Sequence, residues 1–95
     1  MQHRKLGKSG LEVSVIGLGA NNFGGRIDYA QSDSVISQAI DVGINLIDTS
    51  NSYGKTLSED YIGQSLEGRR ESVVIATKVS SRMDDGPNQA GNSRK

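Results

Sequence analysis

The chain has 95 residues, 34% of them hydrophobic, and its 11 basic residues balance 11 acidic ones. This length predicts one small domain, and the balanced charge gives no reason to expect nucleic acid or a membrane as partner. The chain has no cysteine and its first residues lack the apolar core of a secretory signal, so we expect a cytoplasmic protein without a metal site.

The N-terminal residues predict a β-hairpin over residues 1–14, because a Gly-Lys-Ser-Gly turn cluster at 7–10 precedes alternating apolar and polar residues at 11–15. Residues 15–18 then form a short apolar run that predicts a buried strand closed by Gly19. Residues 20–31, which include two glycines and two asparagines, are expected to form a loop that contains Phe23.

Two helices are predicted, each followed by a strand. The first spans about residues 32–42, with Ser32 as N-cap and an apolar stripe of Val35, Ile36, Ala39 and Ile40. The second spans about residues 57–67, opened by a capping-box pattern from Thr56 to Glu59, with a stripe of Tyr61, Ile62, Ser65 and Leu66. Apolar runs at 44–47 and 73–77 predict the strands that follow these helices, and the second strand is expected to extend over residues 73–79.

The predicted order over residues 15–79 is therefore βαβαβ, which implies an α/β fold with a parallel sheet and right-handed crossovers. Residues 80–95 differ, because Met83 and Ala90 are their only apolar residues. This polar segment is either a frayed, disordered tail or a loop cut before the next helix, for which Ser93 would be the N-cap.

Three residues with useful chemistry follow the predicted strands. Asp48 and Tyr53 come after the strand at 44–47, and Lys78 lies near the end of the next one. Ligands bind at the carboxyl ends of parallel strands, so these three side chains are expected on one rim. A tyrosine can protonate a carbonyl oxygen when a nearby ammonium stabilises the phenolate, and two unit charges about 4 Å apart interact by roughly 4 kcal/mol. Asp48 would keep Lys78 charged, and the carbonyl carbon could accept a hydride from a nicotinamide cofactor.

The same three residues also have a purely structural interpretation. Asp48 could cap a helix or a turn, Tyr53 could be a half-buried loop aromatic, and Lys78 could be a strand-end charge that reaches solvent. Spacing alone leaves both interpretations open.

Four segments, in this order and spacing, resemble the aldo-keto reductase family over the whole chain. Residues 4–14 resemble the family's opening hairpin, and residues 16–19 resemble its first barrel strand. The most specific match is Gly-Ile-Asn-Leu-Ile-Asp-Thr at 43–49, followed by Tyr53-Gly54 and by Ser58-Glu59. Ile-Ala-Thr-Lys at 75–78 resembles the family's lysine strand.

The resemblance implies an incomplete (β/α)8 TIM barrel, in which residues 1–95 supply the hairpin, the first three strands and two helices. It implies NADPH-dependent reduction of an aldehyde or ketone in the full-length protein, with Tyr53 as general acid, Lys78 as its partner and Asp48 hydrogen-bonded to Lys78. The implied NADP(H) contacts are Gly19, Ala20, Asn21 and Asp48. The implied substrate contacts are Asn21, Asn22, Phe23 and Tyr53.

The sequence also departs from the family pattern. Many members carry an aromatic residue where this chain has Asn21, which changes one wall of the substrate pocket. The family's catalytic histidine follows its fourth strand, whereas His3, the only histidine here, lies in the hairpin. A complete barrel takes roughly 250 residues, so we expect this chain to be the N-terminal part of a reductase and inactive alone. The substrate, the choice between NADPH and NADH, and the oligomeric state stay open.

Two other functions fit parts of the pattern. One is a non-catalytic barrel fragment or binding subunit, as the potassium-channel β subunits of this fold are. The other is a Rossmann-type dinucleotide-binding module. This alternative is the weaker one, because the Gly-rich segment at 17–22 lacks the third glycine of G-x-G-x-x-G.

Overall fold

A computed structural model describes residues 1–94. Strands β1 (His3–Lys5) and β2 (Glu12–Ser14) pair antiparallel as a hairpin, as predicted. Strands β3 (Leu18–Gly19), β4 (Leu46–Asp48) and β5 (Val74–Ala76) form a parallel sheet in that order. Helix α1 (Tyr29–Asp41) connects β3 to β4, while helix α2 (Leu57–Ser65) and the short 3-10 helix η1 (Arg70–Ser72) connect β4 to β5. The βαβαβ order is therefore the predicted one.

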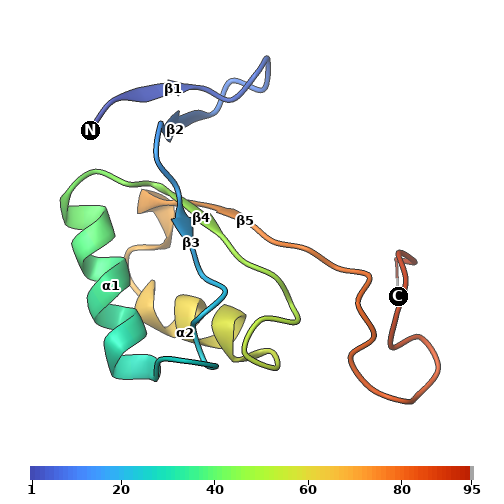
Figure 1. The fold of residues 1–95 in the computed structure, drawn as a ribbon. Helices are drawn as coiled ribbons and strands as arrows, with labels where there is room; N and C mark the ends of the chain where they lie inside the picture. The colour runs from blue at the N-terminus through green and yellow to red at the C-terminus, as the bar shows by residue number, and fades with distance from the viewer. Residues whose placement is uncertain (95) are drawn as a thin grey trace.

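The two helices lie together on one side of the parallel sheet, while the hairpin lies at one end and the C-terminal segment projects away (Figure 1). Strand β4 alternates as a half-buried strand should, because Ile47 is 1% exposed whereas Asp48 is exposed. The buried core between sheet and helices consists of Ala20, Phe23, Ile36, Ile47, Ile62, Leu66 and Val73. Asp48 consequently lies on the sheet face that the helices do not cover. Among residues 1–94, no helix is long and apolar enough to cross a bilayer.

The hairpin is attached to the sheet through the side chain of Asn45, just before β4. Its Oδ1 accepts the Ser14 backbone N–H at 2.7 Å, and its Nδ2 donates to the Glu12 carbonyl at 3.0 Å. Its own backbone N–H donates to the Ser14 hydroxyl at 3.1 Å. One amide side chain therefore satisfies two backbone groups of β2.

Helix α1 begins a turn earlier than predicted, and Ser32 is not its N-cap. The N-cap is Asp28, whose carboxylate accepts the Gln31 backbone N–H at 2.9 Å, while the Gln31 side chain accepts the Asp28 N–H at 3.2 Å. This reciprocal capping box starts the helix at Tyr29 and leaves Ser32 fully buried inside it. Val35, predicted in the buried stripe, is instead 38% exposed.

The capping box predicted for helix α2 is also wrong. Thr56 occupies the N-cap position in the left-handed region, with φ of 80°, and its side chain makes no capping bond. The first backbone N–H groups of the helix instead bond to the turn before it, from Leu57 to the Gly54 carbonyl and from Ser58 to the Tyr53 carbonyl, each at 3.2 Å. The side chain of Glu59 is thereby free to bond elsewhere.

The parallel strands are shorter than their apolar runs. Val15 and Ile16, predicted in a buried strand, are 49% and 56% exposed, and the Val15 N–H donates to the Gln2 carbonyl, so this residue continues the hairpin pairing. Strand β5 covers three of the seven predicted residues. Pairing with the β4 segment nevertheless continues beyond it, since the Asn51 N–H donates to the Lys78 carbonyl at 3.2 Å.

The C-terminal segment folds back on itself and is not an extended tail. Ser80 and Gly91 form an antiparallel bridge, and the Met83 N–H donates to the Gln89 carbonyl at 2.8 Å. The helix start predicted at 93–95 is not seen at residues 93 and 94, and Lys95 lies outside the described residues.

Candidate active site

Asp48 and Lys78 form an ion pair at the carboxyl ends of two neighbouring strands. Asp48 ends β4 and lies opposite Ala76 of β5, so alternation places Lys78, two residues further on, on the same side as Asp48. The Lys78 Nζ donates to Asp48 Oδ1 at 2.7 Å and to the Thr49 carbonyl at 2.9 Å. Both side chains are about half exposed, so the pair stands at the water-accessible rim of the sheet.

Tyr53 is brought beside this pair by a tight turn after β4. Its backbone N–H donates to the Ser50 carbonyl at 3.2 Å, which folds the chain back within a few residues of Asp48. The Lys78 Nζ lies 5.2 Å from the centroid of the Tyr53 ring. The structure thus brings together all three residues predicted to be catalytic.

The electrostatics of the site favour a charged lysine. The hydrogen bond with the Asp48 carboxylate raises the pKa of Lys78 above its ordinary value of 10.5, and Tyr53 adds to the increase. Partial desolvation acts in the opposite direction but does not cancel these contributions. Lys78 is therefore an ammonium at neutral pH, held between a carboxylate and a phenol.

The loop after β3 was predicted to contact cofactor and substrate. Gly19 pairs with Asp48 across the sheet, and the Ala20 N–H donates to the Asp48 carbonyl at 2.9 Å. Asn21 and Asn22 are exposed, whereas Phe23 is only 3% exposed and belongs to the core. The loop therefore offers amide side chains to solvent, and its one aromatic ring packs inward.

The exposed side chains of this rim are chemically compatible with a nicotinamide carboxamide, which both donates and accepts hydrogen bonds. A Cβ placed on Gly19 would have no heavy atom within 4 Å apart from its chain neighbours, so the rim is uncovered at this residue. The exposed amide of Asn21 and the carboxylate of Asp48 supply both donors and acceptors. Within residues 1–94, no three His, Cys, Asp or Glu side chains are grouped so as to hold a metal ion.

Sequence reasoning did not assign site roles to Gly54, Thr49 or Ser58. The φ of Gly54 is +59°, and a Cβ there would stand 2.2 Å from the Phe23 carbonyl oxygen, so the turn carrying Tyr53 rests directly on the loop after β3. Thr49 and Ser58 are fully buried and hydrogen-bonded to each other at 2.8 Å. The available signal was the pair Ser58-Glu59, which the sequence assigns to a capping pattern and to the family resemblance but not to the support of the site.

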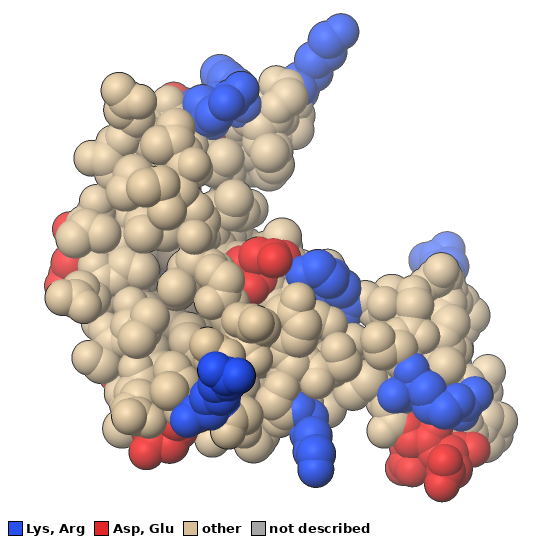
Figure 2. Space-filling model, viewed as in Figure 1, with Lys and Arg blue, Asp and Glu red and all other residues tan. Residues whose placement is uncertain are grey.

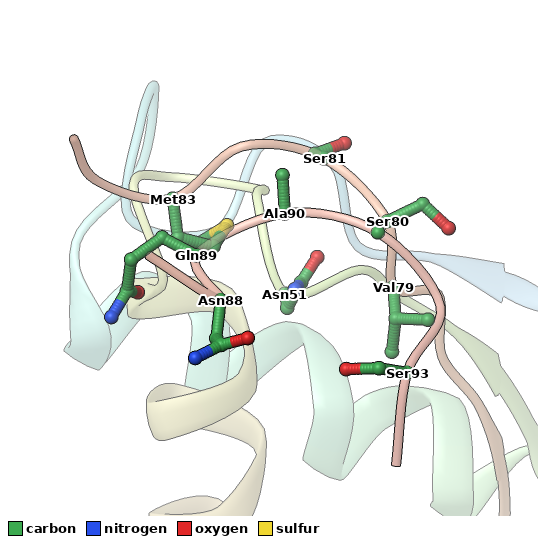
Figure 3. A pocket seen from close by; sticks show the side chains of 10 residues that line it. Asn51, Val79, Ser80, Ser81, Met83, Asn88, Gln89, Ala90 and Ser93 are labelled. Carbon is green, nitrogen blue, oxygen red and sulfur yellow. The ribbon is translucent and has the colours of Figure 1, made fainter. Parts of the chain in front are cut away.

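A cavity of about 200 Å³ lies beside the site, where the C-terminal segment folds back over the end of β5 (Figure 3). Its walls include Asn51, between Asp48 and Tyr53 in the chain, and Val79, next to Lys78. Asp48, Tyr53 and Lys78 themselves do not line it. Charged side chains of both signs are scattered over the face shown in Figure 2 and do not gather in one patch.

A sequence model described as "Aldo/keto reductase family" matches residues 15–95. The chain is 38% identical over 86 residues to the "Uncharacterized oxidoreductase YqkF" of Bacillus subtilis, which covers 90% of this chain and 28% of that protein. It is 37% identical over 99 residues to the "Probable voltage-gated potassium channel subunit beta" of Arabidopsis thaliana, covering 100% of this chain and 30% of that protein.

A solved structure, the holo form of an aldo-keto reductase from Bacillus halodurans, matches with a TM-score of 0.81 at 35% identity, covering 93% of this chain and 29% of the other. The chain thus spans less than a third of the length of these relatives. The three-strand order alone would also suit a Rossmann module, and it is the family match that excludes this alternative. The chain, with its parallel sheet and the Asp48, Tyr53 and Lys78 rim, belongs to the aldo-keto reductase family.

Proposed function

We propose that the full-length protein containing this chain reduces an aldehyde or a ketone to the alcohol with NADPH, using Tyr53 as the general acid. The observation that carries the proposal is the position of the Lys78 ammonium, 2.7 Å from the Asp48 carboxylate and 5.2 Å from the centre of the Tyr53 ring. An ammonium in this position stabilises negative charge on a phenol oxygen.

A bound nicotinamide cofactor would supply the hydride to the carbonyl carbon. Tyr53 donates its phenolic proton to the carbonyl oxygen, which completes the alcohol and leaves a phenolate. Lys78 stabilises that phenolate, and a proton from solvent restores the phenol, so that charge and protons balance over one turnover. Asp48 holds Lys78 charged and in place, through the 2.7 Å hydrogen bond.

The proposed cofactor contacts are Gly19, Ala20, Asn21 and Asp48, all at the ends of β3 and β4. Of the proposed substrate contacts, Asn21 and Asn22 are exposed and Tyr53 is half-buried. Phe23 belongs to the same loop, but its side chain packs in the core and is only 3% exposed, so it is the least accessible of the proposed substrate contacts.

The test is Tyr53→Phe in the full-length protein. Losing a general acid typically lowers the rate about 10²- to 10⁴-fold, so kcat for a simple aldehyde should fall by that factor. Tyr61→Phe is the matched control, because Tyr61 lies on α2 and packs edge-to-face against Tyr29, with ring centroids 5.5 Å apart. Carbonyl reduction by Tyr53→Phe at the wild-type rate would contradict the proposal.

A second candidate function is binding of a partner protein without catalysis. It is favoured by the identity to a potassium-channel β subunit, a protein of the same family. The two functions separate in one experiment. Partner capture that survives Tyr53→Phe, in a wild-type protein that reduces no aldehyde or ketone, would support the binding function.

A further inference from the structure

The first turn of α2 holds the ends of two parallel strands through one buried hydroxyl. The Ser58 Oγ donates to the carbonyl of Ala20, which follows β3, at 3.0 Å. The same oxygen lies 2.8 Å from the Oγ1 of Thr49, which follows β4. Ser58 and Ala20 are 0% exposed and Thr49 is 1% exposed, so water does not compete for these bonds.

The direction of this hydrogen-bond chain follows from its protons. A carbonyl oxygen can only accept, so the single hydroxyl proton of Ser58 goes to Ala20. The Thr49 hydroxyl must then donate to Ser58. The chain therefore runs from Thr49 through Ser58 to Ala20, and each bond polarises the next.

Both ends of this hydrogen-bond chain are linked to the proposed catalytic residues by hydrogen bonds of backbone groups. The Thr49 carbonyl accepts from the Lys78 Nζ at 2.9 Å, and the Ala20 N–H donates to the Asp48 carbonyl at 2.9 Å. The backbone N–H of Ser58 donates to the Tyr53 carbonyl at 3.2 Å. Ser58 is therefore one or two bonds away from all three proposed catalytic residues.

Glu59, the residue after Ser58, makes a similar contact with the end of the third strand, β5. Glu59 accepts a hydrogen bond from the Thr77 hydroxyl at 2.5 Å, and Thr77 directly precedes Lys78. The pair Ser58-Glu59 thus holds the ends of β3, β4 and β5 from a single helical turn. A capping role, which the sequence suggested, is not what these side chains perform.

We propose that Ser58 is a positioning residue, whose buried hydroxyl chain with Thr49 sets the distance between Tyr53 and Lys78 for carbonyl reduction. The inference rests on the proposed function. An apolar side chain would fill the site of Ser58 without desolvating a hydroxyl, so its polar identity needs a reason other than packing. Geometry matters because a misplacement of about 1 Å can cost about a hundredfold in rate.

The test compares Ser58→Ala with Ser65→Ala in the full-length protein. Both are buried serines of α2, but the Ser65 Oγ donates to Asp33 on α1 at 2.6 Å, away from the site. We expect Ser58→Ala to lower kcat at least about tenfold per folded molecule, and Ser65→Ala to change it less than about twofold. Circular dichroism supplies the folded fraction of each variant.

A second pair separates the hydroxyl from packing at Thr49. Thr49→Val keeps the shape and deletes the hydroxyl, whereas Thr49→Ser keeps the hydroxyl and deletes a methyl group. The proposal predicts that Thr49→Ser retains the larger kcat. If Thr49→Val is the more active of the two, or if Ser58→Ala and Ser65→Ala behave alike, the positioning role is wrong.

A readout without turnover distinguishes this failure from failure of the proposed function. In protein with isotope-labelled lysine, the side-chain resonance of Lys78, assigned with Lys78→Arg, reports its contacts with Asp48 and Thr49. We expect it to shift in Ser58→Ala and to stay in place in Ser65→Ala. An unmoved resonance would contradict the positioning role even if the wild-type protein reduces no carbonyl compound.

Discussion

Gly54→Ala should disturb the turn that carries Tyr53 more than any other glycine substitution near the site. The φ of Gly54 is +59°, a region that costs an L-residue about 1–2 kcal/mol. The new Cβ would stand 2.2 Å from the Phe23 carbonyl oxygen, and Cβ contacts below 3.0 Å essentially do not occur. One loop must therefore retreat by about 0.8 Å. Overpacking of this kind costs about 1–3 kcal/mol, so the total destabilisation is about 2–5 kcal/mol.

The same displacement should reach the phenol, because Tyr53 is the adjacent residue. A shift near 1 Å lowers kcat by about a hundredfold, which steady-state kinetics at a temperature where the variant is folded will measure. Urea unfolding gives the stability change. Gly63→Ala is the control, because Gly63 lies inside α2 with nothing within 4 Å of the added Cβ, and it should stabilise by up to about 1 kcal/mol. If Gly54→Ala matches Gly63→Ala in stability and kcat, the close approach of the two loops is not real.

Two further predictions concern the ion pair and the hairpin. The pKa of Lys78 is raised above 10.5 on folding, so from neutral pH up to about pH 10.5 its pairing with the Asp48 carboxylate stabilises the protein, and this effect is lost as the pH rises through the folded pKa. Urea unfolding of the wild type and Lys78→Met measures this contribution as a difference in stability. We expect that difference to shrink only in strongly alkaline solution. A difference that already shrinks between about pH 6 and pH 9, below the ordinary lysine pKa, would contradict the prediction. Asn45→Ala removes the hydrogen bonds to the Ser14 N–H and the Glu12 carbonyl, at a cost of about 0.5–1.5 kcal/mol each because water can reach these groups, and should raise hydrogen exchange in β1 and β2 but not in α1. Unchanged exchange in the hairpin would show that Asn45 does not attach it.

The order of elements could be predicted because apolar runs and turn residues alternate clearly along the chain. The approximate position of the site followed from the same pattern, since Asp48 ends a buried strand and Lys78 follows the next one. Parallel strands bring their carboxyl ends to one rim. The 2.7 Å hydrogen bond between Lys78 and Asp48 is the structural consequence of that rule.

The boundaries were harder to predict because competing caps differ by small energies. Asp28 and Ser32 both suit an N-cap, and only the reciprocal bond with Gln31 decides for Asp28. At α2, the left-handed conformation of Thr56 removes its side chain from the helix end. No local pattern indicates this, because the conformation depends on a turn held by the loop after β3.

The supporting contacts of the site depend on residues far apart in sequence. Ser58 meets the Ala20 carbonyl 38 residues away, and Gly54 meets the Phe23 carbonyl across a similar separation. A hydroxyl or a glycine has no periodicity that would single it out. The resemblance to the family pointed to Asp48, Tyr53 and Lys78 as the proposed catalytic side chains, whereas these contacts became visible only in three dimensions.

The measurement that tests the central claim most directly is the stoichiometry of alcohol formation by the full-length protein. NADPH and a panel of simple aldehydes and ketones are incubated with the protein, and consumed NADPH and formed alcohol are both quantified. The proposed reduction of a carbonyl compound by NADPH predicts one alcohol for each NADPH consumed. Binding of NADPH with no alcohol formed from any carbonyl compound of the panel would contradict this proposed function.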